Sequence, residues 1–265
     1  MKYIPAILLA VAAAATSPAN PVAAQGVAQK VTGAPDGEVR MSFAARPDVC
    51  GDGVNNIRWS GRHRTVRDDD DDVVYQNGDC PCVGGPVRVV FRVADHRVSR
   101  VKTVVGGAWR ADARAVDLGT VSTRDAVAAL LAIAQDGKNG GGENAIFPAT
   151  LADSVTVWPQ LLTIARNNQV PQDSRKQAVF WLSQVASDSA TSGLADLAGS
   201  DKEGDEIRKQ AVFALSQRPK DEGVPALIKV AKSRTSAEVR KSALFWLGQS
   251  EDPRALALFE DILSH

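Results

Sequence analysis

Residues that commonly perform chemistry are few in this sequence, and they lie far apart. The three histidines are His63, His96 and His265, and no H-E-x-x-H or G-x-S-x-G motif occurs. Carboxylates are plentiful, but they occur in polar loops or at the expected starts of helices. The sequence therefore predicts no catalytic residue, no metal site and no cofactor, and we expect the protein not to be an enzyme.

The three cysteines, Cys50, Cys80 and Cys82, could form a disulfide. An oxidising compartment favours such a bond, and Cys80 and Cys82 stand too close in the chain to bond each other without strain. We therefore expect Cys50 to bond one of them, with Cys82 as the working prediction and Cys80 left open. Zinc binding lacks a fourth ligand at the required spacing. Redox activity of the three thiols is an alternative that thiol titration would test.

Charged residues gather at two places in the first half of the chain. The acidic run at 67–72 is expected to be a solvated loop, because it lacks the alternating ligands and central glycine of a calcium loop. Four cations, Arg88, Arg92, Arg100 and Lys102, are expected to share one face of a hairpin and to pair with nearby acids. Over all 265 residues, 31 basic side chains balance 31 acidic ones, so charge gives no indication of nucleic-acid binding.

The amino-terminal segment 1–24 has the layout of a secretory signal peptide. A single lysine precedes an apolar run at 3–15, and the segment ends in Val22-Ala23-Ala24. The apolar run is short for a transmembrane helix. We expect cleavage after Ala24 and a periplasmic or secreted protein that no longer contacts the membrane.

The rest of the chain is expected to have a β-rich part followed by a helical part. Segment 25–115 is expected to be a small β-rich unit, because 87–93 and 98–105 alternate apolar and polar residues around a short polar turn. Segments 38–44 and 56–61 are further candidate strands. The chain as a whole is therefore expected to be α+β.

Segment 116–168 is expected to be a helical connector and the start of a solenoid. Residues 123–135 place apolar side chains on one helical stripe and have Ser122 or Thr123 as a cap. The glycine-rich segment 137–144 is expected to be a flexible loop, and a second helix is expected over 157–168.

From residue 169 to 265 the sequence repeats. The phrases RKQAVFWLSQ (175–184), RKQAVFALSQ (208–217) and RKSALFWLGQ (240–249) begin 33 and 32 residues apart. A second phrase, such as VPALIKVA at 224–231, repeats in step with the first. Each unit is therefore predicted to be two helices, and stacking of the units would supply the core that no unit has alone.

The period and the sequence of these units resemble HEAT repeats, in particular the short HEAT-like repeats of phycobilin-lyase-type proteins. The residues that carry the resemblance are EIRKQAVFALSQ with GVPALIKVAK (206–232), and their counterparts at 238–263. The whole chain also resembles secreted bacterial HEAT-repeat proteins with a cysteine-containing amino-terminal part. The resemblance implies an all-α solenoid and no particular activity.

One aromatic position in the repeat is the candidate binding site. Phe180, Phe213 and Phe245 fall opposite the Ala–Leu stripe that forms the core, at a position that is commonly polar in the family that the repeat resembles. They would form a ladder that either contacts a partner or packs sideways on the next unit. The following position holds Trp181 and Trp246 but Ala214 in the middle unit, so we group both tryptophans with the ladder.

These observations favour a non-enzymatic envelope scaffold whose solenoid binds a protein or peptide. The alternative is an accessory factor or weak hydrolase, with a pocket near Arg88, Arg92 and His96 in the β-rich unit. The sequence predicts neither the partner nor the oligomeric state.

Overall fold

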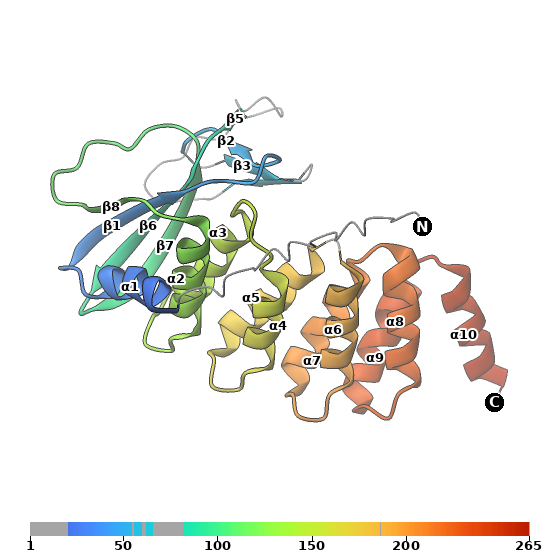
Figure 1. Ribbon diagram of the computed structural model, residues 1–265. Coiled ribbons are helices and arrows are strands. Elements are labelled where there is room, and N and C mark those ends of the chain that lie inside the picture. Colours follow the sequence, from blue (N-terminus) through green and yellow to red (C-terminus); the bar gives the residue numbers. More distant parts are fainter. Residues whose placement is uncertain (1–20, 55, 60–61, 66–81, 186, 265) are drawn as a thin grey trace, which may run out of the picture.

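The computed structural model describes residues 21–54, 56–59, 62–65, 82–185 and 187–264. It confirms the α+β architecture, with two small sheets at one end of a row of helices that leads to the carboxy terminus (Figure 1). Cys80, His265, the acidic run at 67–72 and most of the predicted signal peptide lie outside the described residues.

A four-stranded sheet forms the centre of the amino-terminal unit. Its strands, in order of pairing, are β7 (Arg97–Val105), β6 (Val87–Ala94), β1 (Gly37–Phe43) and β8 (Val116–Thr120). The predicted hairpin is β6–β7, and its turn residues Asp95 and His96 have φ values of 51° and 58°. Both are left-handed, as a two-residue type I′ turn requires.

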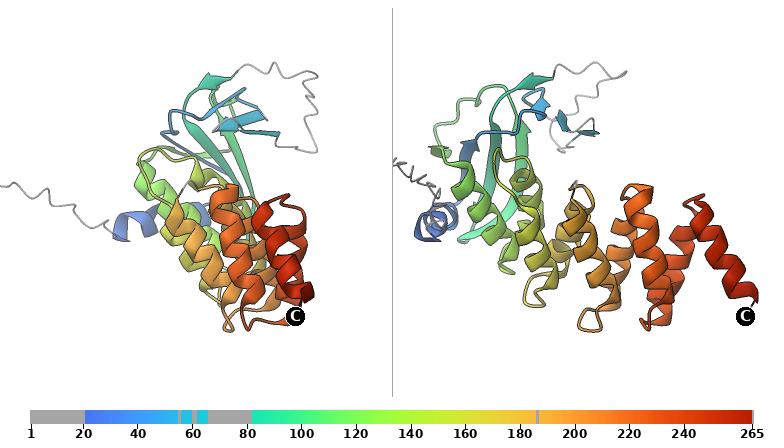
Figure 2. Two further views of the ribbon diagram at one scale, coloured as in Figure 1. Left: turned by 90° about the vertical axis from the view of Figure 1, so that its right-hand side faces the viewer. Right: turned by 45° about the vertical axis from the view of Figure 1, so that its right-hand side comes forward.

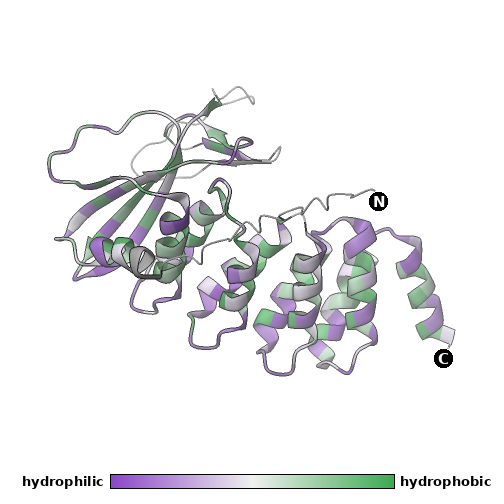
Figure 3. Cartoon of the chain, viewed as in Figure 1, coloured by the Kyte–Doolittle hydropathy of each residue, from purple (hydrophilic) through white to green (hydrophobic). Residues whose placement is uncertain are grey.

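Alternation along the strands separates a buried face from an outer face (Figure 3). Val87, Val89, Phe91 and Val93 are at most 1% exposed, and burial of each such side chain contributes about 1.5–3 kcal/mol. Helices α1 (Pro21–Thr32) and α2 (Thr123–Gln135) pack together and against this sheet. The Ser122 hydroxyl caps α2 by accepting a hydrogen bond from the Asp125 amide at 3.1 Å, as predicted.

The β-rich unit extends past the predicted boundary at residue 115. Strand β8 pairs in parallel with β1, and the Val121 amide donates to the Ser42 carbonyl at 2.8 Å. Strand β8 and α2, both placed in the connector, therefore belong to the packing of the sheet, because β1 still has a free edge for β8 to occupy.

The glycine-rich segment 137–144, predicted to be a flexible loop, is packed in part, because Asn139, Gly141 and Gly142 are buried. A Cβ on Gly141 or Gly142 would lie 2.7 Å from the carbonyl oxygen of Ser99 or Ile133, respectively. Asn139 is 8% exposed, and its side chain accepts from the Val98 amide at 2.9 Å and donates to the Ile133 carbonyl at 3.1 Å. The glycines permit close backbone approach between strand and helix.

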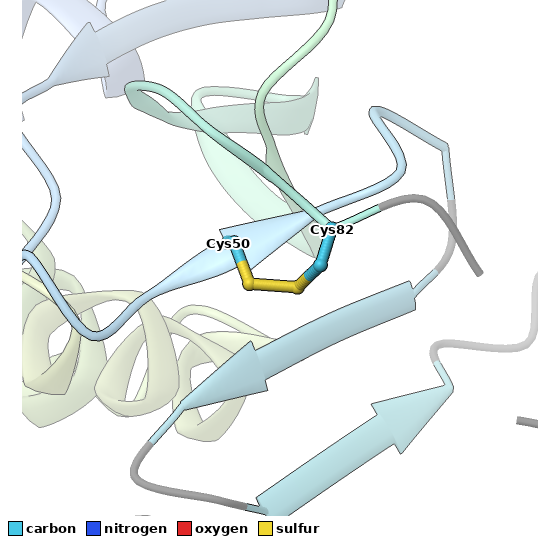
Figure 4. The surroundings of a disulfide bond; sticks show 2 residues. All are labelled: Cys50 and Cys82. Atoms are coloured by element: carbon cyan, nitrogen blue, oxygen red, sulfur yellow. A yellow bond between two sulfur atoms is a disulfide. The ribbon is translucent and has the colours of Figure 1, made fainter. Parts of the chain in front are cut away.

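A second, smaller sheet carries the disulfide. Its strands, in order of pairing, are β4 (Arg62–Thr65), β3 (Asn56–Trp59), β2 (Cys50–Gly51) and β5 (Val83–Gly84). Cys50 on β2 bonds Cys82 beside β5, with a Cα–Cα distance of 5.1 Å, which confirms the working prediction (Figure 4).

The helices of the array form two layers, which we call A and B (Figure 2). The A layer contains η1 (Gly142–Ala145) with α3 (Ile146–Thr150), α5 (Gln172–Ser183), α7 (Asp205–Ser216) and α9 (Ala237–Gly248). The B layer contains α4 (Trp158–Arg166), α6 (Asp188–Gly199), α8 (Lys220–Lys232) and α10 (Pro253–Ser264). Neighbours stack along each layer, and Ile207, Ala211 and Leu215 of α7, which belong to the expected apolar stripe, are buried.

Ala24, the predicted cleavage position, lies within helix α1. The assignment of 1–24 as a signal peptide stays a prediction. Across the described residues, no helix has both the length and the hydropathy needed to cross a bilayer.

Candidate protein-binding surface on the solenoid

The predicted phenylalanine ladder exists, and its members differ in exposure. Phe180 and Phe213 are half-buried, whereas Phe245 is 57% exposed. The Phe213 ring lies 5.2 Å from the ring of Trp246 in the next unit, and the Phe245 ring lies 5.1 Å from that same tryptophan. The ladder therefore packs partly on neighbouring units and becomes a free surface toward the carboxy terminus.

Trp181 was grouped with the partner-binding residues, and the structure corrects this assignment. It is 2% exposed, and its ring stacks on Phe147 at 4.9 Å and lies 5.8 Å from Trp59 of strand β3. Helix α5 is covered by α3 and by Trp59 of the small sheet, whereas α9 is the last helix of the A layer that the structure describes. Trp246, at the same repeat position, stays half-buried.

The ladder has an earlier member, Phe147, which the repeat analysis missed. It precedes Phe180 by 33 residues, the same interval that separates Phe180 from Phe213. Thr150 donates to the Phe147 carbonyl at 2.7 Å, and Ser183 makes the equivalent bond to Phe180 at 2.6 Å. The short phrase AIF at 145–147 could have revealed this degenerate A helix. Pro148 and the glycines before it obscured the match.

A row of glutamines runs beside the ladder. Gln184, Gln217 and Gln249 each follow a ladder phenylalanine by four residues, which places both side chains on the same helical face. Gln217 and Gln249 are exposed, and Gln184 is half-buried.

Three hollows adjoin one another and share lining residues, and we call them together the edge groove. The hollow beside the small sheet, about 240 Å³, includes Trp59, Trp158, Trp181 and Gln184. The middle hollow, about 550 Å³, shares Gln184 with the first and shares Gln217 and Arg218 with the last. The last hollow, about 370 Å³, includes Trp246 and Gln249. The edge groove thus combines amide groups at the repeat spacing with aromatic walls at both ends.

Comparison with known families agrees with this geometry. HEAT repeats match residues 159–245 and 201–265. Residues 159–265 form a HEAT-repeat array. Helix α4, at the start of this match, lies in segment 116–168, where the solenoid was expected to begin. No curated protein matches the chain.

Buried arginines fix the HEAT array and hence the edge groove. The Arg175 Nε donates to the Ala165 carbonyl at the end of α4 at 2.9 Å, and its Nη2 pairs with Glu203 of the next loop. Arg208 repeats the first bond, to the Ala198 carbonyl of α6, at 3.4 Å. Arg175 thus ties its helix both to α4 before it and to the loop that precedes α7.

Arg218 forms the floor of the middle of the groove. It is 7% exposed, and it donates to the Thr191 hydroxyl at 2.8 Å, to Glu222 at 2.7 Å and to the Val185 carbonyl. The Thr191 hydroxyl and then the Arg218 guanidinium hold the pKa of Glu222 below its usual value. This charged pair is fixed in place, because Arg218 also donates to Thr191 and to backbone carbonyls, and Glu222 also accepts from Thr191.

The alternative site in the β-rich unit is only partly assembled. A hollow of about 230 Å³ lies beside Arg88, but His96 is at the hairpin turn, with its Nδ1 3.2 Å from the Thr32 carbonyl. No group of three His, Cys, Asp or Glu side chains with metal-binding geometry occurs within the described ranges. The expectation that the protein is not an enzyme stays a prediction.

Proposed function

We propose that the HEAT array binds an extended segment of a partner protein in the edge groove. The observation that carries this proposal is the row of three adjoining hollows, which are lined by Gln184, Gln217 and Gln249 at intervals of 33 and 32 residues. An extended chain exposes unpaired amide and carbonyl groups along its length, and side-chain amides both donate to and accept from such groups.

Aromatic side chains at the ends of the edge groove would supply most of the affinity. Trp246 lines the last hollow, and Phe245 beside it is the most exposed phenylalanine of the ladder. Tryptophan is enriched among residues that dominate interface energies, whereas the surrounding polar contacts mainly exclude water. Trp246 lines the edge groove, and Phe180, Phe213 and Phe245 form the adjoining ladder. These four keep the proposed partner-binding role that Trp181 loses.

The role as a scaffold outside the cytoplasm is part of the same proposal. The signal-like segment 1–24 and the Cys50–Cys82 disulfide support it, because disulfides persist mainly in oxidising compartments.

The proposal is tested by selecting peptides that bind the oxidised protein from a displayed random library. Affinities of selected peptides are then measured for Trp246→Ala, Gln249→Ala and the matched control Lys241→Ala. Lys241 is exposed on the same helix but does not line the edge groove. Loss of a tryptophan hot spot should weaken binding about thirtyfold, whereas the control should bind normally. Binding that Trp246→Ala and Gln249→Ala leave unchanged would exclude the edge groove as the site.

A further inference from the structure

The outer face of the four-stranded sheet has an excess of positive charge that the proposed function does not use. The pairing register places Glu38 opposite Arg92 and Arg92 opposite Arg100, while Arg40 and Lys102 flank Val90. Arg88 lies on the same face, between Ser42 and Val104. Arg92 and Arg100 are thus like charges directly across a strand pair, an arrangement that destabilises a sheet.

Arg88 lies at the base of the 230 Å³ hollow in this face. The hollow is also lined by Arg40, Lys102, Trp109, Arg110 and a single carboxylate, Glu38. The Arg88 and Arg40 guanidinium carbons lie 4.8 Å and 5.4 Å from the centre of the Trp109 ring. Glu38 pairs with Arg40 at 3.0 Å, and the Asp112 carboxylate lies 3.9 Å from the same guanidinium, so these two acids pair with Arg40 and not with Arg88.

Arg88 is 4% exposed, and no carboxylate pairs with it in the part of the chain that the structure describes. Its Nη2 donates to the Gly53 carbonyl at 3.0 Å, whereas its Nε is buried without an acceptor. Burial, and then the charge of Arg40, lower the pKa of Arg88. The indole of Trp109 compensates only part of the cost of burying this cation.

We propose that this hollow, which we call the Arg88 pocket, binds a small oxyanion, the phosphate or carboxylate group of a ligand. Arg88 supplies a fixed charge at the base, Lys102 supplies an adaptable charge at the wall, and Trp109 limits the width. An anion in the pocket offsets both the unpaired charge of Arg88 and the repulsion between neighbouring cations. The volume suits one oxyanion group better than a drug-sized molecule, for which pockets of about 300–1,000 Å³ are usual.

Calorimetric titration of the oxidised full chain tests the proposal, with inorganic phosphate and acetate as separate probes and chloride at equal ionic strength as reference. Saturable binding of phosphate alone identifies a phosphate pocket, and binding of acetate alone identifies a carboxylate pocket. If neither probe binds beyond the chloride reference, the proposal is overturned.

Two variants separate the Arg88 pocket from general attraction to a basic face. Lys102→Gln removes one charged donor from the lining and should weaken binding about tenfold. Arg92→Gln removes the same charge from the same sheet face, but Arg92 does not line the hollow, so binding should change less than twofold. Equal losses in the two variants would refute a defined pocket. Both variants alter half-buried or exposed side chains, so folding can be verified by circular dichroism before titration.

Discussion

Replacing the two repeat tryptophans with alanine should have very different effects on stability. Trp181 and Trp246 occupy the same position in their units, and the middle unit already has Ala214 there. Trp181 is 2% exposed, with ring contacts to Phe147 and Trp59, whereas Trp246 is half-buried.

The expected losses follow from burial. Trp181→Ala empties a closed site between the array and the small sheet, and such truncations cost about 3–5 kcal/mol. Trp246→Ala removes a half-covered ring with contacts to Phe213 and Phe245, for which we expect a loss of about 1–2 kcal/mol. The difference between the variants should therefore be about 2–3 kcal/mol.

Urea unfolding of the oxidised full chain, followed by far-UV circular dichroism, measures both losses under the same conditions. Trp181→Phe is a useful third variant, because it keeps an aromatic contact to Phe147 and should recover part of the lost stability. If the two alanine variants lose equal free energy, or if Trp246→Ala loses more, then Trp181 does not join the sheets to the array as the structure indicates.

Two further predictions concern the disulfide and acid stability. Replacing Cys50 and Cys82 with serine opens a loop with a sequence separation of 32 residues, which should lower the free energy of unfolding by about 3–4 kcal/mol. Equal urea midpoints for the variant and the oxidised wild type would contradict this expectation. Hydrogen bonds from Arg254 lower the pKa of Asp252 to about 2, below its unfolded value, so its stabilising effect is present above about pH 4 and is lost as pH falls toward 2. The difference in melting temperature between wild type and Asp252→Asn should shrink over that range, and a difference independent of pH would argue against the Asp252–Arg254 pair.

Much of the fold was predictable because its signals are local. Alternation along 87–93 and 98–105 indicated the β6–β7 hairpin, and the Ser122 cap with its apolar stripe indicated α2. The glycines at 141 and 142 were misread as a flexible loop, since sequence does not distinguish a glycine needed for close packing from one that confers mobility. Strand β8 was missed because it is held by pairing with β1, which lies far away in the chain.

Part of the candidate site was also predictable from the sequence. The repeat placed Phe180, Phe213 and Phe245 on one helical face, because angular position depends only on residue spacing. The edge groove was not predictable, because its hollows form between elements that come together only through folding. A pocket near Arg88 was considered from the sequence, but tertiary structure decided that Trp109 lines it and that Arg92 and His96 do not.

The sequence by itself determined the period of the array, its two-helix unit and the side chains that recur on each face. Tertiary structure decided which copies of a recurring side chain are free. Phe147 is 5% exposed beside the small sheet, and Phe245 is 57% exposed near the other end of the array. The physical reason is that a helix fixes the direction of a side chain, whereas the neighbouring element determines whether that direction leads into the core or to solvent.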